Sequence, residues 1–448
     1  MLIPVSTSHQ LSLLNPELLI QLDYKDPLLI LANRIPWQEF EVSFSKHYSL
    51  TKGRPCKPIR LMVGLLILKQ LENLSDETLV LQFKRNPYYQ SFCGLTEFTT
   101  EYPCASSELV HFRQRIGKDG VEQIFMMSAL LHGKAIEEKD VNIDTTVQEK
   151  NITYPTDGKL CIKIINRLNK IAKQHNISQR RTYVKEIKEL RLALRFFRHI
   201  KKRKKAKSAM KRLKTIGMKL IRELTRTLPD KILDQHQADI DLYVKVLKQQ
   251  RQDKNKIYSL HEPQIYCIAK GKDHKAYEYG TKASIVATAK GGIILAAVSH
   301  EQNIHDSRTL KEVLEKTNKV RKTEPLRAVC DRGYRGVSSI GNTSIVLPKP
   351  PLKKDSRYQR DIKRKRCRRR AAIEPIIGHL KSDYRLAVNY LKGFVGDQIN
   401  LLMAACGWNL KKWMKSAHHF LYCIIRGKYF TFKRNCAFIF EAENLATF

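Results

Sequence analysis

Residues 139–155 read KDVNIDTTVQEKNITYP, and this stretch decides the fold class. Its β-branched residues stand in near alternation, which is typical of a β-strand. The regions on either side instead space their apolar residues like the faces of helices. The strand therefore predicts an α/β core with helical additions rather than a helical bundle.

A second block of strand and helix patterns begins near residue 278. EYGTKASIVATAKGGIILAAVSH (residues 278–300) predicts a hairpin that turns at Lys290-Gly291-Gly292, with positive φ at the glycines. DSRTLKEVLEKTNK (residues 306–319) predicts a helix capped by Asp306. Short strands are expected at 326–330 and 343–348, and helices at 371–386 and 397–413. This order of elements is an α/β pattern.

The N-terminal region is mostly helical by its apolar spacing. Ser75 provides a capping signal, and Leu79, Val80 and Phe83 follow at helical intervals. Another helix is expected in SSELVHFRQRIG (residues 106–117). Short helices joined by turns fit either a helix-turn-helix reader of DNA or a docking module, and the near-zero net charge of this region leaves both open.

The charge of the chain is segregated along the sequence. The 448 residues carry 82 Lys+Arg and 43 Asp+Glu, a net charge of +39. Residues 1–140 hold 15 basic and 16 acidic residues, whereas residues 161–260 hold 29 and 8, and residues 351–370 hold 11 and 2. One-sided fields of this size bind polyanions, because each neutralised phosphate releases condensed counterions. Nucleic acid is the expected partner, and a solvated basic face without a partner is the weaker interpretation.

Other classes of protein are disfavoured by features that the sequence lacks. It has no apolar run of about 18 residues, as a transmembrane helix requires. The start MLIPVSTSHQ lacks the charged and apolar regions of a signal peptide. The ten cysteines are scattered without a CxxC pair, which favours reduced thiols. We therefore expect a cytoplasmic protein with no membrane partner.

Residues 161–260 predict a helical insertion with a basic outer face. Two apolar sets are each spaced like one face of a helix: Ile187, Leu190, Leu194 and Phe197, then Leu213, Ile216, Leu220 and Leu224. Between them KKRKKAK (residues 201–207) carries six charges in seven residues, which is typical of a loop or an exposed helix turn. This run either grips DNA without sequence preference or only solvates the insertion.

Three acids stand where chemistry is expected: Asp144 in the first core strand, Asp331 at the end of a later strand, and Glu374 at the start of a helix. Such positions can converge at one edge of a sheet. Mg²⁺ prefers carboxylate oxygens, and two ions can activate the attacking oxygen and stabilise the leaving one in a phosphoryl displacement. Each acid alone also has a structural interpretation, as a turn cap, an Asx-turn or a first-turn helix acid. Asp157 in PTDGK is interpreted as a turn residue, and Asp306 as a helix cap.

At these acids the sequence resembles the DDE transposases of bacterial insertion sequences, specifically the IS-five family. The central blocks are NIDTTVQEKNITYPTDGKL (142–160), VCDRGYRG (329–336) and RRRAAIEPIIGHLKSDYRL (368–386). Residues 53–83, 256–282 and 406–413 are also similar to that family, so that the resemblance runs from about residue 40 to residue 415. It implies an RNase H-like core, a mixed sheet flanked by helices. It also implies that this core binds two Mg²⁺ ions, or Mn²⁺ in their place, cuts DNA at element ends and joins the freed 3′-hydroxyl to target DNA.

The resemblance also assigns roles to single residues. By position, Asp144, Asp331 and Glu374 match the catalytic, metal-binding triad. A related signature of Tyr, Arg, Glu and Lys is met by Arg370, Glu374 and Lys381, but Cys367 stands in the Tyr place. The residues expected to bind DNA are Arg370, Lys381, Arg332, Arg335, Lys201, Lys202, Arg203, Lys204 and Lys205. Pro375 is best tolerated in the first turn of a helix, so Glu374 is expected at or just before the helix start, with Arg370 approaching from the preceding segment.

The expected organisation has four parts: a helical N-terminal domain (1–135), a catalytic core (136–160 and 261–418), a basic helical insertion (161–260) and a C-terminal tail (419–448) without an assigned role. Trp408 and Trp413 are expected to pack rather than to stack on bases, and His418-His419 to lie at the surface. The resemblance implies a bacterial, nucleoid-associated homodimer that acts on double-stranded DNA. Two alternatives stay open: an RNase H-like nuclease or resolvase without joining activity, and a non-catalytic DNA-binding derivative.

Overall fold

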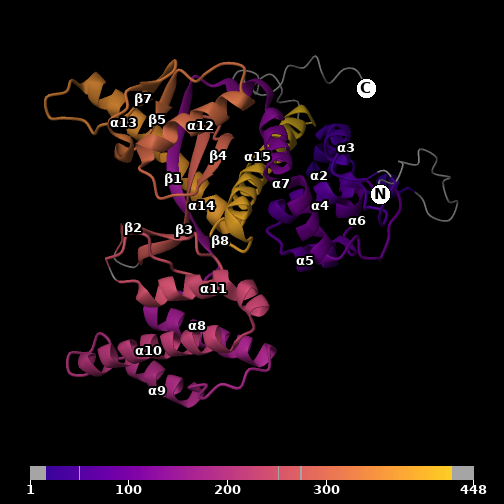
Figure 1. The fold of residues 1–448 in the computed structure, drawn as a ribbon. Coiled ribbons are helices and arrows are strands. Elements are labelled where there is room, and N and C mark those ends of the chain that lie inside the picture. The colour runs from indigo at the N-terminus through magenta and orange to yellow at the C-terminus, as the bar shows by residue number, and fades with distance from the viewer. Residues whose placement is uncertain (1–16, 50, 251, 273–274, 426–448) are drawn as a thin grey trace. The chain divides into compact units, whose positions relative to one another are not determined.

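A computed structural model describes residues 17–49, 51–250, 252–272 and 275–425. The chain divides into two compact units, residues 1–149 together with 281–448, and residues 150–280 (Figure 1). The composition-based insertion at 161–260 lies inside the second unit, and the expected boundary at residue 135 lies inside the first. The side chains of His418 and His419, and residues 426–448 of the predicted tail, lie outside the described residues.

The sheet is mixed, as the family resemblance implied. Its strands are β1 (Asp140–Lys150), β2 (Tyr266–Lys272), β3 (Lys275–Thr288), β4 (Ile294–His300), β5 (Arg327–Val329), β6 (Ser339–Ile340), β7 (Thr343–Val346) and β8 (Val388–Asn389). Strand β1 lies between β3 and β5; β5 is parallel to β1 and β7, whereas β4 is antiparallel to β3. The hairpin from β3 to β4 is confirmed, but only Gly292 of its two glycines has positive φ, at 62°.

Helices bury both faces of this sheet. Those of the first unit are α1 (Leu18–Gln21), α2 (Pro27–Arg34), α3 (Trp37–Ser45), α4 (Ile59–Leu71), α5 (Asp76–Phe83), α6 (Pro87–Phe92), α7 (Ser106–Leu130), α12 (Asp306–Val320), α13 (Arg357–Ala371), α14 (Ile373–Asp383) and α15 (Gly393–Ile425). Side chains alternate between the faces of a strand. Ile285 of β3 accordingly joins the apolar cluster of α15, and its neighbour Val286 joins that of α12.

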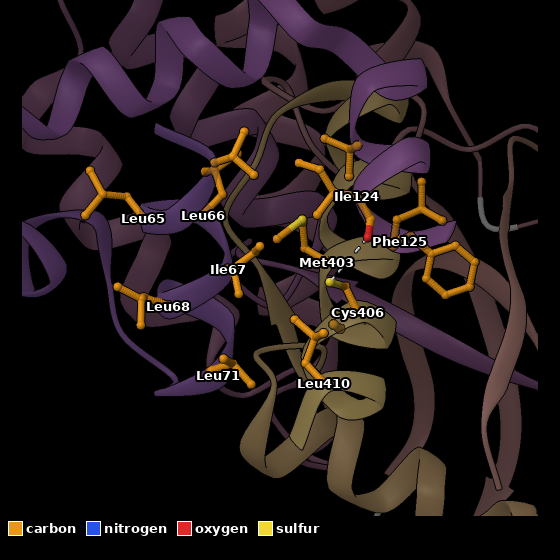
Figure 2. Close-up of a cluster of buried hydrophobic side chains, with 14 of the residues drawn as sticks. Leu65, Leu66, Ile67, Leu68, Leu71, Ile124, Phe125, Met403, Cys406 and Leu410 are labelled. Carbon is orange, nitrogen blue, oxygen red and sulfur yellow. Dashed lines mark hydrogen bonds between the residues drawn. The ribbon is translucent and has the colours of Figure 1, made fainter. Parts of the chain in front are cut away.

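The N-terminal helices share a hydrophobic core with α15. Leu65 and Ile67 of α4, Ile124 of α7 and Leu410 of α15 are fully buried in one cluster, and Figure 2 shows side chains of these three helices directed toward one another. The Cys406 thiol donates to the carbonyl of Ile124 at 3.8 Å across the α7–α15 contact. The N-terminal helices are therefore packed on the core rather than tethered to it.

Two amides of α15 bind the backbone of β4. The Asn409 side chain accepts from the N–H of Ile294 and donates to its carbonyl, both at 2.9 Å. Gln398 accepts from the N–H of Ser299 at 2.8 Å and donates to the carbonyl of Ala297 at 2.9 Å. These bonds satisfy strand groups that would otherwise be buried without partners.

The second unit contains the predicted basic helices. They are α8 (Asp157–Gln174), α9 (Val184–Leu194), α10 (Arg203–Thr227) and α11 (Asp230–Lys248). The set Leu213, Ile216, Leu220 and Leu224 is fully buried, as predicted. The prediction for Phe197 was wrong, because α9 ends at Leu194 and leaves this ring 46% exposed. Asp157 is the first residue of α8 behind the Thr156 cap rather than a turn residue.

Several local predictions have clear outcomes. Ser75 caps α5 by accepting from the N–H of Thr78. The Asp306 cap was wrong, because the side chain of His305 accepts from the N–H of Ser307 and Asp306 is the first residue of α12. Trp413 is 3% exposed and Trp408 donates to the carbonyl of Gly292 at 2.8 Å, so both pack as expected. Within the described ranges, no helix has the length and apolar character to cross a membrane.

Candidate active site

The register of two parallel strands brings Asp144 and Asp331 to the same level of the sheet. In the β1–β5 ladder, Asn142 is the partner of Val329. Each acid lies two residues further along its own strand direction. Asp144 belongs to β1, whereas Asp331 lies just beyond the end of β5 at Val329. The register therefore brings two acids 187 residues apart in sequence to adjoining places in the fold.

The Asp144 side chain is 14% exposed, much less than that of Glu374 at 58%. Its Oδ1 accepts from the N–H of Thr145 at 2.8 Å. Burial is the main cause that raises the pKa of the Asp144 carboxyl to about 6; the charges of Asp331 and Glu374 add to the rise, whereas the Thr145 N–H and the Arg370 guanidinium oppose it. The Asp144 carboxylate thus interacts electrostatically with both other acids of the triad and with one cation.

Arg370 joins two of the predicted acids. Its Nη1 lies 3.2 Å from Glu374 Oε1, and its Nη2 lies 3.7 Å from Asp144 Oδ2. Arg370 belongs to the last turn of α13, whereas Glu374 lies in the first turn of α14 with Pro375 directly after it. The expectation that Arg370 approaches Glu374 from the preceding segment is confirmed. The Glu374 side chain is 58% exposed, so this acid lies at the open rim of the group.

Asp331 has a structural role in a turn in addition to its electrostatic interaction with Asp144. Its Oδ1 accepts from the N–H of Gly333 at 2.8 Å and caps the short 3₁₀ helix η2 (Arg332–Tyr334). The Asx-turn interpretation of Asp331 is therefore correct and does not compete with a role in the site. Arg332 and Arg335 are exposed on the same turn.

The donor set of the site suits a hard divalent cation, because it consists of carboxylate oxygens. As the side chains stand, no three or more Asp, Glu, His or Cys residues of the described chain are grouped to hold an ion. The guanidinium of Arg370 lies between two of the three acids and offsets their charge. A metal held by Asp144, Asp331 and Glu374 therefore requires that Arg370 withdraw.

Sequence reasoning missed the contacts of Asp306 and the buried ring of Tyr334 beside these acids. Asp306 Oδ1 accepts from Lys282 Nζ at 2.9 Å and from Thr145 Oγ1 at 3.2 Å. The ring of Tyr334 is fully buried, and its hydroxyl has no hydrogen-bond partner in the described part of the chain. The partners of Asp306 lie 24 and 161 residues away in sequence, so no local pattern distinguishes it from a helix cap.

A strongly basic helix adjoins the acids. α13 contains nine Lys and Arg residues and one acid, and none of its side chains is buried. Its C-terminal end is fixed to β1, because Asn142 Nδ2 donates to the carbonyl of Arg369 at 2.9 Å and Arg369 Nη1 lies 3.7 Å from Asp140. Cys367 contacts the carbonyl of Lys349 at 3.7 Å. Lys381 lies in the last turn of α14.

The other predicted DNA-binding residues belong to the second unit. Lys201 and Lys202 precede α10, and Arg203, Lys204 and Lys205 form its first turn. All five are exposed, and the Lys202 ammonium lies over the ring of Phe196 at 4.5 Å. They therefore belong to a different compact unit from the three acids.

Comparison with known proteins places the chain among transposases. Residues 16–115 match the family model "Transposase domain (DUF772)", and residues 245–410 match the family model "Transposase DDE domain". Asp331 and Glu374 lie inside the second range, whereas Asp144 lies between the two. The chain is also 40% identical over 180 residues to a Rhizobium meliloti protein described as "Uncharacterized protein ORF8 in nfe locus", an alignment that covers 39% of this chain and 86% of that protein. No solved structure matches the chain.

These matches define a class of enzyme, the DNA phosphoryl-transferases that move mobile elements and generally use divalent metal ions. The chain belongs to the DDE transposases of insertion sequences, and its core is RNase H-like. The predictions of transposase function and of this fold are confirmed at that level. The narrower assignment to the IS-five family stays a prediction.

Proposed function

We propose that the chain cuts DNA at the ends of an insertion sequence and transfers the freed 3′-hydroxyl into target DNA, with Asp144, Asp331 and Glu374 holding two divalent metal ions. The observation that carries this proposal is the Arg370 guanidinium, which contacts both Asp144 and Glu374, beside an Asp144 carboxyl whose pKa is raised by burial and by the charge of Asp331. Strand register sets Asp144 beside Asp331, and one guanidinium bridges Asp144 to Glu374. The bound ions would supply Lewis-acid activation of the attacking and leaving oxygens.

The residues around the acids have the chemistry to hold DNA phosphates. The nine cations of α13 project from a helix with no buried side chain, and the helix ends beside Asp144. Arg370 binds two carboxylates, and it becomes available to a phosphate once metal ions neutralise them. Lys381, Arg332 and Arg335 lie on the elements that carry Glu374 and Asp331, and we assign them to the DNA backbone near the cut.

The test of the triad uses single amide substitutions, which keep side-chain shape and remove the charge. Asp144→Asn, Asp331→Asn and Glu374→Gln should each retain binding to an element-end duplex and lose cleavage in Mg²⁺. The matched control is Asp119→Asn, an exposed acid of α7 in the same compact unit, which should cleave like the wild type. Cleavage that survives any one triad substitution rejects the role of that residue.

A joining assay separates the proposal from its two alternatives. Pre-cut ends with free 3′-hydroxyls should be inserted into a supercoiled target by the wild-type protein. Cleavage without insertion would favour a nuclease or resolvase. Binding with neither activity would favour a non-catalytic DNA-binding derivative, in which the acids have no metal to hold.

We further propose that residues 201–205 of the second unit grip DNA without sequence preference. Removing one lysine that binds a phosphate should reduce the slope of log affinity against log salt by about 1. Replacing Lys201, Lys204 and Lys205 by Gln should lower affinity equally for element-end and random duplexes. We also infer a homodimer that assembles on paired ends, and light scattering of the protein with and without end DNA tests this state.

A further inference from the structure

Asp306 lies among the acids although it is outside the predicted triad. Its Oδ1 accepts from Thr145, the residue after Asp144, and from Lys282. Its Oδ2 faces the turn of Asp331: a Cβ placed on Gly333 would lie 2.9 Å from Asp306 Oδ2 and 3.0 Å from Asp331 Oδ1. One oxygen of each carboxylate therefore lies beside the same glycine.

Lys282 binds one oxygen, Oδ1, of the Asp306 carboxylate. Its ammonium donates to Asp306 Oδ1 at 2.9 Å and to the carbonyl of Ile304 at 2.7 Å, and its side chain is 13% exposed. The hydrogen bonds that Asp306 accepts from Lys282 and Thr145 both end on Oδ1, whereas Oδ2 lies beside Gly333. Oδ2 can therefore accept a hydrogen bond from a water molecule that a bound cation carries.

Tyr334 supplies an independent sign that a ligand belongs here. Its side chain is fully buried, and among the described residues its hydroxyl meets no hydrogen-bond partner. Burial raises the pKa of this hydroxyl well above its usual value. Cys330 adds to that rise, followed by Asp306, Asp144 and Asp331, so all three carboxylates lie within electrostatic reach. A buried hydroxyl without a partner is unfavourable, and a bound water or ion would satisfy it.

The charges of the acids and their basic partners also favour the binding of a cation. Four carboxylates, those of Asp144, Asp306, Asp331 and Glu374, are met by two basic side chains, Lys282 and Arg370. Mg²⁺ and Mn²⁺ keep several water ligands when only a few carboxylates bind them directly. Such waters need acceptors and donors in the surrounding shell.

We propose that Asp306 is a positioning residue of the metal site, whose Oδ2, together with the Tyr334 hydroxyl, receives the water ligands of an ion held by Asp144 and Asp331. Lys282 and Thr145 hold the carboxylate in place for this purpose. The inference rests on the proposed function, because it assumes that Asp144 and Asp331 bind the metal. It assigns a role to a residue outside the triad.

The experiment measures Mn²⁺ binding to the full chain without DNA, by titration calorimetry and by the water-proton relaxation of bound Mn²⁺. Asp306→Asn keeps the shape of the side chain and removes its charge, and Tyr334→Phe removes one oxygen atom. Removing a residue that holds the waters or ligands of a metal typically weakens metal affinity by about 10–100-fold. We expect a decrease in this range for Asp306→Asn, a decrease of at least severalfold for Tyr334→Phe, and an altered relaxation per bound ion in both. Asp119→Asn is the control and should bind like the wild type.

The outcomes separate this inference from the function on which it rests. If Asp331→Asn abolishes Mn²⁺ binding while Asp306→Asn and Tyr334→Phe bind like the wild type, the positioning role is overturned and the metal site stands. If Asp331→Asn itself binds Mn²⁺ normally, the proposed metal site fails. Circular dichroism checks folding, and if Asp306→Asn does not fold, Tyr334→Phe decides the question by the same readouts.

Discussion

Removing Arg370 should strengthen metal binding and weaken DNA binding. In the structure its guanidinium pairs with Glu374 at 3.2 Å and with Asp144 at 3.7 Å, so an incoming ion must first displace it. The side chains of these pairs range from 14% to 58% exposed, and a partly exposed ion pair contributes about 0.2–1 kcal/mol. The two pairs together therefore oppose metal binding by about 0.5–2 kcal/mol. At 1.4 kcal/mol per factor of ten, Arg370→Gln should tighten Mn²⁺ binding by about 2- to 30-fold.

The assay is Mn²⁺ titration calorimetry of the DNA-free protein at low salt, repeated for the neighbouring substitution Arg369→Gln. This control removes the same charge from the same helix turn, but the Arg369 guanidinium lies 3.7 Å from Asp140 rather than on the triad. We expect Mn²⁺ affinity to rise only in Arg370→Gln. Both variants should bind DNA more weakly, with the salt slope reduced by about 1 per arginine.

An Mn²⁺ affinity that falls in Arg370→Gln would refute this reasoning, because it would mean that Arg370 organises the acids for the metal instead of competing with it. An equal rise in both arginine variants would point to the general field of α13 rather than to the bridge. In either case the pairing of Arg370 with Asp144 and Glu374 would not oppose metal binding in the way argued above.

Further predictions concern stability. Burial lowers the pKa of His132 from 6.5 to about 4; the unfolded chain therefore binds a proton that the native state excludes, and native stability decreases as pH falls from 6.5 toward 4. Denaturant unfolding measures the free energy of unfolding at pH 7.5 and at pH 4.5. The difference between these two values should be smaller by about 2 kcal/mol in His132→Gln than in the wild type, and an unchanged difference would contradict the lowered pKa of His132. A Cβ at Gly407 would lie 2.8 Å from the Tyr384 ring, so Gly407→Ala should destabilise the protein by about 1–3 kcal/mol. A Cβ at Gly378 would meet nothing within 4 Å, so Gly378→Ala should stabilise the protein by about 0.5–1 kcal/mol. Ile67→Ala should cost about 2–5 kcal/mol and Ile67→Val about 0.5–1.5 kcal/mol in the same measurement; equal costs would place Ile67 outside a close-packed core.

Patterns of local origin could be predicted from the sequence. Ser75 and the apolar set that follows it depend only on neighbours within one helix, and both were predicted correctly. The strand containing Asp144 and the helix that starts near Glu374 were also found, because alternation and proline placement are local signals. The convergence of Asp144 and Asp331 was expected from their places near strand ends, and the family resemblance supported it. The β1–β5 register that relates the two segments cannot be deduced from either segment alone.

Features that depend on distant partners were missed or misread. Asp306 looked like a helix cap because Asp before Ser at a helix start commonly caps, but His305 fills that position and leaves Asp306 to bind Lys282 and Thr145. The packing of the N-terminal helices against α15 was also not predicted. One signal for it existed: α4 is apolar around its whole circumference, with 11 of 13 residues buried, and such a helix must be covered on every side.

The energetics of the acid group favour a metal-binding role over a purely structural one. Burial and two neighbouring acids raise the pKa of Asp144 to about 6, so holding this carboxylate ionised at pH 7 costs folding free energy in the absence of a metal. Asp331 and Glu374 repel the Asp144 carboxylate, and the buried Tyr334 hydroxyl lacks a partner within the described residues. A protein that only gripped DNA would gain stability by replacing these groups with neutral ones, since its nine-cation helix α13 needs none of them to attract phosphates. Strained groups of this kind are retained at a cost in stability where a ligand relieves them, and a divalent ion with its water shell would relieve the repulsion, the buried charge and the unpartnered hydroxyl at once.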